Sequence, residues 1–158
     1  LARVHFHHRW QVAGKEGWTA KRLMTFHHEH KIFLLARTAD AKRALGRTIA
    51  AGFDAGLPAA EVALKYMIEA QEHLNVLPRR GRFAHAMERA LGRMDLALSS
   101  PRREQVIESI HAYRKGHLPR MTPLLLLDHL AGTSGSIPSW LGHLSNPVPA
   151  ATGVLARV

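Results

Sequence analysis

The segment HHEHK at residues 27–31 places three histidines and a lysine inside an otherwise apolar run. Imidazole and ammonium groups can ligate a metal, move a proton or bind an anion. At about 100° per helical residue, His27, His30 and Arg37 share a face with the neighbouring leucines and phenylalanines. A buried arginine needs a partner, so we expect either a carboxylate beside Arg37 or a cleft that admits an anion. Core histidines satisfied by hydrogen bonds are the alternative.

Neither a metal site nor a nucleophilic enzyme is indicated by the remaining motifs. His27 and His30 have the spacing of two helical ligands, but no further cluster supplies a third ligand, and the His-Glu-x-x-His pattern is not completed. The chain has no cysteine, and no serine lies in a Gly-x-Ser-x-Gly turn. We therefore expect no metal, no cofactor and no catalytic activity of this chain alone.

The charge pattern favours an anionic partner. Lysine and arginine outnumber aspartate and glutamate by 22 to 12, and the isoelectric point is about 11.1. The excess lies in residues 1–47 and 76–120, and the intervening segment 48–75 is acidic. Basic surfaces of this kind bind polyanions such as nucleic acids. If the two basic segments pack side by side, their cations can form one continuous surface.

The elements that position these residues are expected to be helices, because no stretch alternates as a strand does. N-cap residues such as Thr19, Asp40 and Ser100, prolines in first turns and glycines at helix ends divide the chain. The expected helices cover residues 4–12, 19–36, 40–52, 58–77, 83–98, 100–116 and 122–132. We predict a single compact all-α domain of six to seven helices over residues 1–145, with an irregular tail at 146–158.

Five motifs then support a family resemblance: RVHFHHRW, LMTFHHEHKIFLLA, RALGR, LSSPRREQVIESIHAYRKGHLPRMTPLLLLDHL and SNPVP. Their order and spacing resemble the YbgA-like family of unknown-function domains over essentially the whole chain. Members of that family occur alone or fused behind a thiouracil desulfidase domain that carries an iron–sulfur cluster. In fusions that remove sulfur from thiolated uridine in tRNA, the YbgA-like part is understood as the RNA-binding module.

Matching the motifs residue by residue gives Phe26, His27, His30, Lys31, Arg43, Gly46, Tyr113, Arg114, Gly116, Pro119, Pro123, Asn146 and Pro147. The chain departs from the family at residues 83–87, where FAHAM replaces a frequent His-x-Asn-Val-Leu segment. If the missing histidine and asparagine hold a ligand, this chain holds a different one or holds it through His85.

Resemblance and charge together predict an accessory nucleic-acid-binding domain that binds tRNA or another structured RNA for a uridine desulfidase. The desulfidase, an iron–sulfur domain, would lie in cis or in trans. Phosphates would meet arginines in the loop LPRRGR, and an unpaired base would stack on Tyr113. The expected RNA- or anion-binding residues are His27, His30, Lys31, Arg37, Arg43, Arg47, Arg79, Arg80, Arg82, His85, Tyr113, Arg114 and Lys115.

Two other functions stay open at this point. A small-molecule or anion sensor, or an enzyme, would use a pocket formed by His27, His30 and Arg37. A structural or protein-interaction module would carry its charge only for solubility. No apolar run reaches the roughly 18 residues that a membrane-spanning helix requires, and no signal peptide is evident, so we expect a cytoplasmic protein without a membrane partner.

Overall fold

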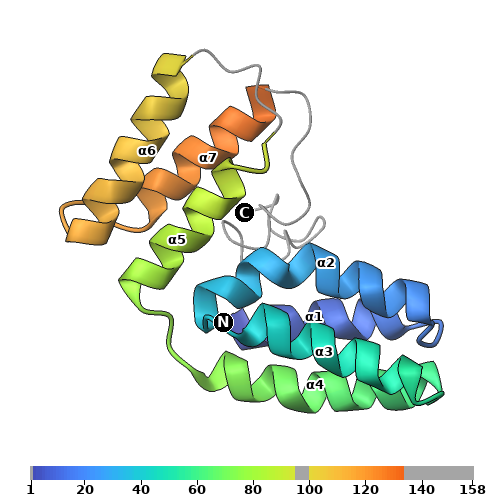
Figure 1. Ribbon diagram of the computed structural model, residues 1–158. Coiled ribbons are helices and arrows are strands. Elements are labelled where there is room, and N and C mark those ends of the chain that lie inside the picture. The colour runs from blue at the N-terminus through green and yellow to red at the C-terminus, as the bar shows by residue number, and fades with distance from the viewer. Residues whose placement is uncertain (1, 95–99, 134–158) are drawn as a thin grey trace, which may run out of the picture.

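The computed structural model describes residues 2–94 and 100–133, and these residues contain helices and no strands. The predicted all-α fold is confirmed (Figure 1). The irregular tail expected at residues 146–158 lies outside the described residues. The helices are α1 (Ala2–Gly14), α2 (Ala20–Arg37), α3 (Ala41–Asp54), α4 (Ala59–Asn75), α5 (Arg80–Leu91), α6 (Ser100–Lys115) and α7 (Met121–Thr133).

Side-chain caps fix where α2 and α3 begin. Thr19 accepts a hydrogen bond from the backbone N–H of Arg22 at 3.2 Å, as its position before α2 predicts. Asp40 precedes α3, but its side chain makes no capping hydrogen bond. The hydroxyl of Thr38 accepts from the N–H of Ala41 at 3.1 Å instead. Thr38 therefore replaces Asp40 as the side-chain cap of α3.

The boundaries of α5 correct two expectations. The helix begins at Arg80, so Arg80 and Arg82 lie in its first turn and only Arg79, at the N-cap position, precedes it. The helix ends at Leu91 rather than near residue 98. Gly81 lies in the first turn of α5 and adopts no positive φ, so it does not interrupt the helix.

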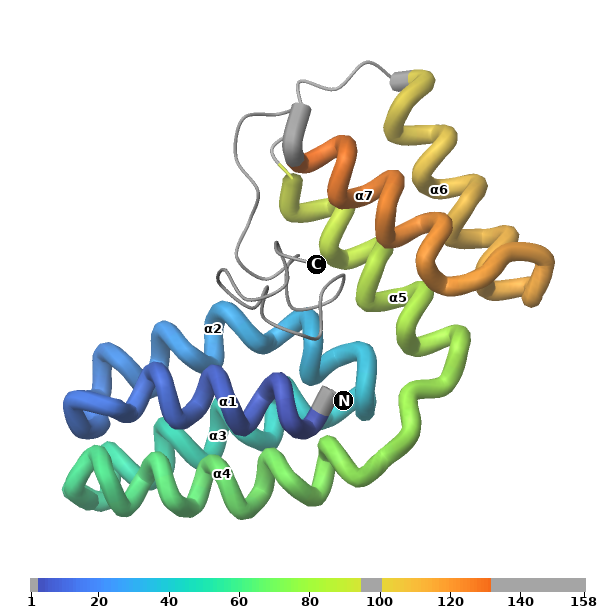
Figure 2. Tube along the Cα trace, turned by 180° about the vertical axis from the view of Figure 1, so that it is seen from behind, coloured from blue at the N-terminus to red at the C-terminus, as the bar shows by residue number. Residues whose placement is uncertain are grey.

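The helices form two groups that meet at α2 and α5 (Figures 1 and 2). Helices α1 to α4 enclose one apolar cluster that includes Phe6, Phe26 and Tyr66. Helices α5 to α7 enclose a second cluster, to which α2 contributes Ile32 and Ala36. Helix α2 thus has one face in each cluster, and the junction between the groups is packed through α2 and α5.

No helix in residues 2–94 and 100–133 is both long enough and apolar enough to cross a membrane.

Candidate functional site

His30 is a core residue. Its side chain is 1 % exposed, its ring stacks on Phe26 with 4.0 Å between ring centroids, and Nδ1 lies 2.8 Å from the carbonyl oxygen of Phe26. Burial lowers the pKa of His30 to about 4, because the charged form would lose its hydration. His30 is therefore neutral at pH 7, and Nδ1–H donates to the helix backbone.

His27 lies half-buried between α2 and the neighbouring helices. Its Nδ1 is 3.3 Å from the hydroxyl oxygen of Tyr66 on α4. Burial, followed by the positive charges of Lys31 and Lys42, lowers the pKa of His27 to about 4. This imidazole is also neutral at pH 7, and the cations that act on it are Lys31 and Lys42, whereas Arg9 acts on His30.

Arg37 occupies a different place from the two histidines. Its guanidinium carbon lies 5.3 Å from the centroid of the Phe33 ring, an arrangement that stabilises a partly desolvated cation. Burial, and then the charge of Arg120, lower the pKa of Arg37. The expected carboxylate partner is not among the ion pairs of the described residues. His27, His30 and Arg37 share the inward side of α2, but they do not line the cleft between α2, α3 and α5.

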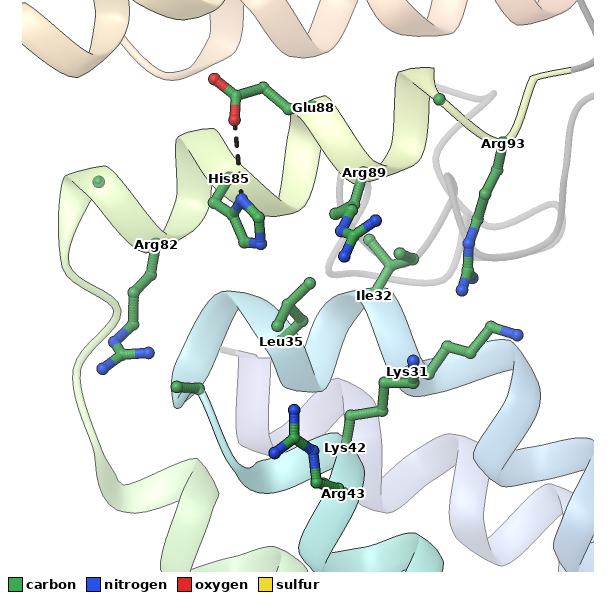
Figure 3. Close-up of a pocket in the computed structure, with 13 residues that line it drawn as sticks. Lys31, Ile32, Leu35, Lys42, Arg43, Arg82, His85, Glu88, Arg89 and Arg93 are labelled. Carbon is green, nitrogen blue, oxygen red and sulfur yellow. Dashed lines mark ion pairs between the residues drawn. The ribbon is translucent and has the colours of Figure 1, made fainter.

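That cleft has a volume of about 700 Å³ and is lined mainly by cations. Figure 3 shows Arg82, His85 and Arg89 of α5, and Arg93 just beyond its end, directed toward α2 and α3 across the cleft, whereas Glu88 points away. Ile32 and Leu35 of α2 form its apolar floor. Its lining holds one carboxylate, Glu88, together with the imidazole of His85. The six cations that line it are Lys31, Lys42, Arg43, Arg82, Arg89 and Arg93.

The two basic segments of the sequence meet across this cleft. Of the residues expected to bind RNA, the cleft brings together Lys31, Arg43, Arg82 and His85. Sequence reasoning missed Lys42, Arg89 and Arg93. A signal for the arginines was present, because residues 82, 85, 89 and 93 recur every three or four positions and so share one side of a helix. Arg47, Arg79 and Lys115 are exposed and lie outside the cleft lining.

Tyr113 and Arg80 form part of the α5–α6 contact. The Tyr113 side chain is 7 % exposed, and the guanidinium carbon of Arg80 lies 5.5 Å from its ring centroid. Nη1 of Arg80 also donates to the carbonyl oxygen of Tyr113 at 3.4 Å. This burial places Tyr113 in the core of the second helical group and does not present its ring as a stacking platform for a base.

Glu88 joins the cleft to α6. Its carboxylate accepts a hydrogen bond from Nη2 of Arg114 at 2.6 Å, and His85 and His111 lie 3.7 and 3.6 Å away. Arg114 is therefore engaged by Glu88, and its charge is not directed at the cleft. The only acidic side chain in the cleft lining is thus partly neutralised from the α6 side.

At one end of the cleft, Arg93 lies beside Lys31 (Figure 3). Burial, followed by Arg93 and Lys42, lowers the pKa of Lys31. The ammonium nitrogen of Lys31 lies 2.9 Å from Nδ1 of His28, whose own pKa is lowered by burial and then by Lys31. Like charges brought together in this way repel one another, and a bound anion would relieve the repulsion.

No cluster of three histidine, aspartate or glutamate side chains suited to a metal ion occurs in the described residues. The arrangement supports anion binding and supplies no nucleophile with an adjacent base.

Comparisons with known proteins give one match. A family described as "Protein of unknown function (DUF1722)" matches residues 31–136, a range that contains every residue lining the cleft. No curated protein and no solved structure matches the chain.

Proposed function

The chain belongs to the DUF1722 family, and we propose that it is an accessory RNA-binding domain whose cationic cleft binds the phosphate backbone. The observation that carries the proposal is the cleft itself, in which six cations face one carboxylate. Neutralising several phosphates at once releases counterions, and this release supplies most of the affinity of backbone-binding proteins.

The composition of the cleft supports recognition of the backbone rather than of bases. Its described lining contains no aromatic side chain other than the His85 imidazole, whereas single-strand readers stack bases on aromatic rings. Cations stand on both walls: Lys31, Lys42 and Arg43 on one, and the arginines of α5 on the other. A backbone lying between the walls would be contacted from both sides.

The resemblance to YbgA-like domains suggests which RNA to test. We propose tRNA, bound on behalf of a uridine desulfidase whose iron–sulfur domain lies elsewhere in the same protein or in a cytoplasmic partner. Catalysis would then belong to that domain, and the helical chain would hold the substrate.

The test is retention of tRNA measured over a range of salt concentrations. Replacing Arg82, Arg89 and Arg93 together by alanine should weaken binding and reduce the slope of log K against log [salt] by about 2 to 3, because each lost phosphate contact removes about 0.7 to 0.9. The matched control replaces Lys15, Arg102 and Arg103, three exposed cations outside the cleft. Equal effects of the two triple variants, or no salt-dependent retention of tRNA, would refute the proposal.

A second function is favoured by one observation, the volume of the cleft. About 700 Å³ lies within the range of pockets that enclose small ligands, roughly 300–1,000 Å³. If the natural ligand is a small anion, the affinity of the cleft for RNA should depend little on the length of the RNA. Competition distinguishes the two functions: a mononucleotide that displaces tRNA at concentrations near its own dissociation constant favours the small ligand.

A further inference from the structure

We propose that the Lys31 end of the cleft continues into a phosphate subsite, in which the Nε2–H of His27 donates a hydrogen bond to an oxygen of the bound phosphate. The subsite rests on the proposed function, because Lys31 and Lys42 belong to both. It adds a neutral hydrogen-bond donor, and a position for one phosphate, to the cations of the cleft.

The tautomer of His27 follows from its contact with Tyr66. The Tyr66 side chain is fully buried, and burial raises its pKa further, so the hydroxyl keeps its proton. A buried hydroxyl hydrogen needs an acceptor, and Nδ1 of His27 lies 3.3 Å away. Tyr66 therefore donates to Nδ1. In a neutral imidazole the other nitrogen, Nε2, then carries the hydrogen.

Gly46 leaves space beside that nitrogen. The residue lies inside α3, where glycine is less stable than alanine. Its φ is not positive, so the backbone does not require glycine. A Cβ at this position would meet a single neighbour within 4 Å, Nε2 of His27 at 3.6 Å. Packing does not require glycine either. What the missing side chain provides is room at the donor atom.

The cations around this space come from two helices and a turn. Lys42 precedes Gly46 by one helical turn and so lies on the same side of α3. The charges of Lys31 and Lys42 both act on His27, and Arg93 and Lys42 both act on Lys31. Lys31 and Lys42, with Arg93 acting on Lys31, and one N–H donor match the several oxygens of a phosphate better than the two of a carboxylate. The phosphate can come from an RNA backbone or from a free phosphate ester.

The experiment uses the full chain with 15N-labelled histidine, inorganic phosphate as the probe, and tRNA in a separate arm. Ring nitrogen shifts should show His27 protonated at Nε2, and phosphate should shift that signal. Gly46→Ala should weaken phosphate binding about tenfold, the loss expected for one hydrogen bond to a charged group. Ala51→Ser is the control, because Ala51 is an exposed residue of the same helix and does not line the cleft.

The outcomes separate the subsite from the proposed function. Weakening of both tRNA and phosphate binding by Gly46→Ala, with binding unchanged by Ala51→Ser, supports a backbone phosphate. A shift of His27 by phosphate without any tRNA binding supports the subsite with a free phosphate or ester, and refutes the RNA function. If tRNA binds in a salt-dependent way but neither probe shifts the His27 Nε2 signal, the subsite is refuted and the RNA function stands. His27 protonated at Nδ1 would also refute the subsite.

Discussion

At the scale of single residues, the burial of His30 makes stability depend on pH. The folded state holds its pKa at about 4, below the usual 6.5, so the unfolded chain binds more protons between these values. The contribution of His30 to stability is present above pH 6.5 and is lost as the pH falls toward 4. It amounts to about 3 kcal/mol, since each pKa unit corresponds to about 1.4 kcal/mol.

Denaturant unfolding at several pH values between 7 and 4 tests this expectation. Replacing His30 by phenylalanine removes the titrating group, so the free energy of unfolding should fall less on acidification than in the wild type. Exposed His117 provides the control, because His117→Gln should keep the wild-type pH dependence. Parallel curves for the wild type and the His30 variant would show that other groups cause the acid sensitivity.

The helical projection of residues 22–37 predicted correctly that His27 and His30 face inward, because this depends only on periodicity. It could not separate a core histidine from one at the edge of a site. That distinction depends on contacts between helices: Phe6 of α1 lies 5.3 Å from the His30 ring, and Tyr66 of α4 contacts His27. Contacts of this kind depend on how the helices pack together, and they leave no pattern in the local sequence.

At the scale of elements, the α3–α4 contact depends on the missing side chain of Gly52. A Cβ there would lie 2.7 Å from Cγ2 and 2.9 Å from Cγ1 of Val62, and valine has little rotamer freedom in a helix. Gly52→Ala should therefore lower the free energy of unfolding by about 1 to 3 kcal/mol, as overpacking does. Gly46→Ala, in the same helix, should be neutral or stabilise by up to about 1 kcal/mol.

Thermal or denaturant unfolding of four proteins gives the coupling between the two residues: wild type, Gly52→Ala, Val62→Ala and the double variant. If the clash with Val62 causes the loss, the double variant should be more stable than the sum of the single effects predicts. Additive effects would mean that Gly52→Ala acts elsewhere in α3.

Sequence signals predicted the positions of the helices better than they predicted the capping residues and the first residue of each helix. Thr19 caps α2 as predicted, because a hydroxyl before an apolar run acts locally. Asp40 has the same kind of signal and does not cap, since Thr38 reaches the N–H of Ala41. The start of α5 inside LPRRGR was missed because glycine and proline usually mark a break. The missed start left only Arg82 outside the expected helix, since residues 89 and 93 lay within the expected range 83–98.

At the scale of the whole molecule, the charge pattern along the chain identified the two basic segments whose cations line the cleft, but it predicted neither that they meet nor that the core has two parts. Hydrophobic spacing identifies the inward face of each helix without showing which partner that face contacts. Ile32 lies in the cluster of α5 to α7, whereas Phe33 and Leu34, its neighbours in α2, lie in the cluster of α1 to α4. The cleft follows from this division, because it lies where the two groups meet.

Ile32 therefore tests whether the two helical groups open separately. Its side chain is 2 % exposed and belongs to the second cluster. Ile32→Ala should therefore lower the free energy of unfolding by about 2 to 5 kcal/mol. Because Ile32 is the larger of the two α2 side chains that pack in the second cluster, native-state hydrogen exchange should show faster opening of α5 to α7 than of α3 and α4. Ile49→Ala is the matched control, since Ile49 is 6 % exposed and lies in the first cluster. It should give the reverse pattern, with α3 and α4 opening first.

If both variants lower protection equally in all helices, the groups unfold as one cooperative unit, and opening of the cleft requires global unfolding.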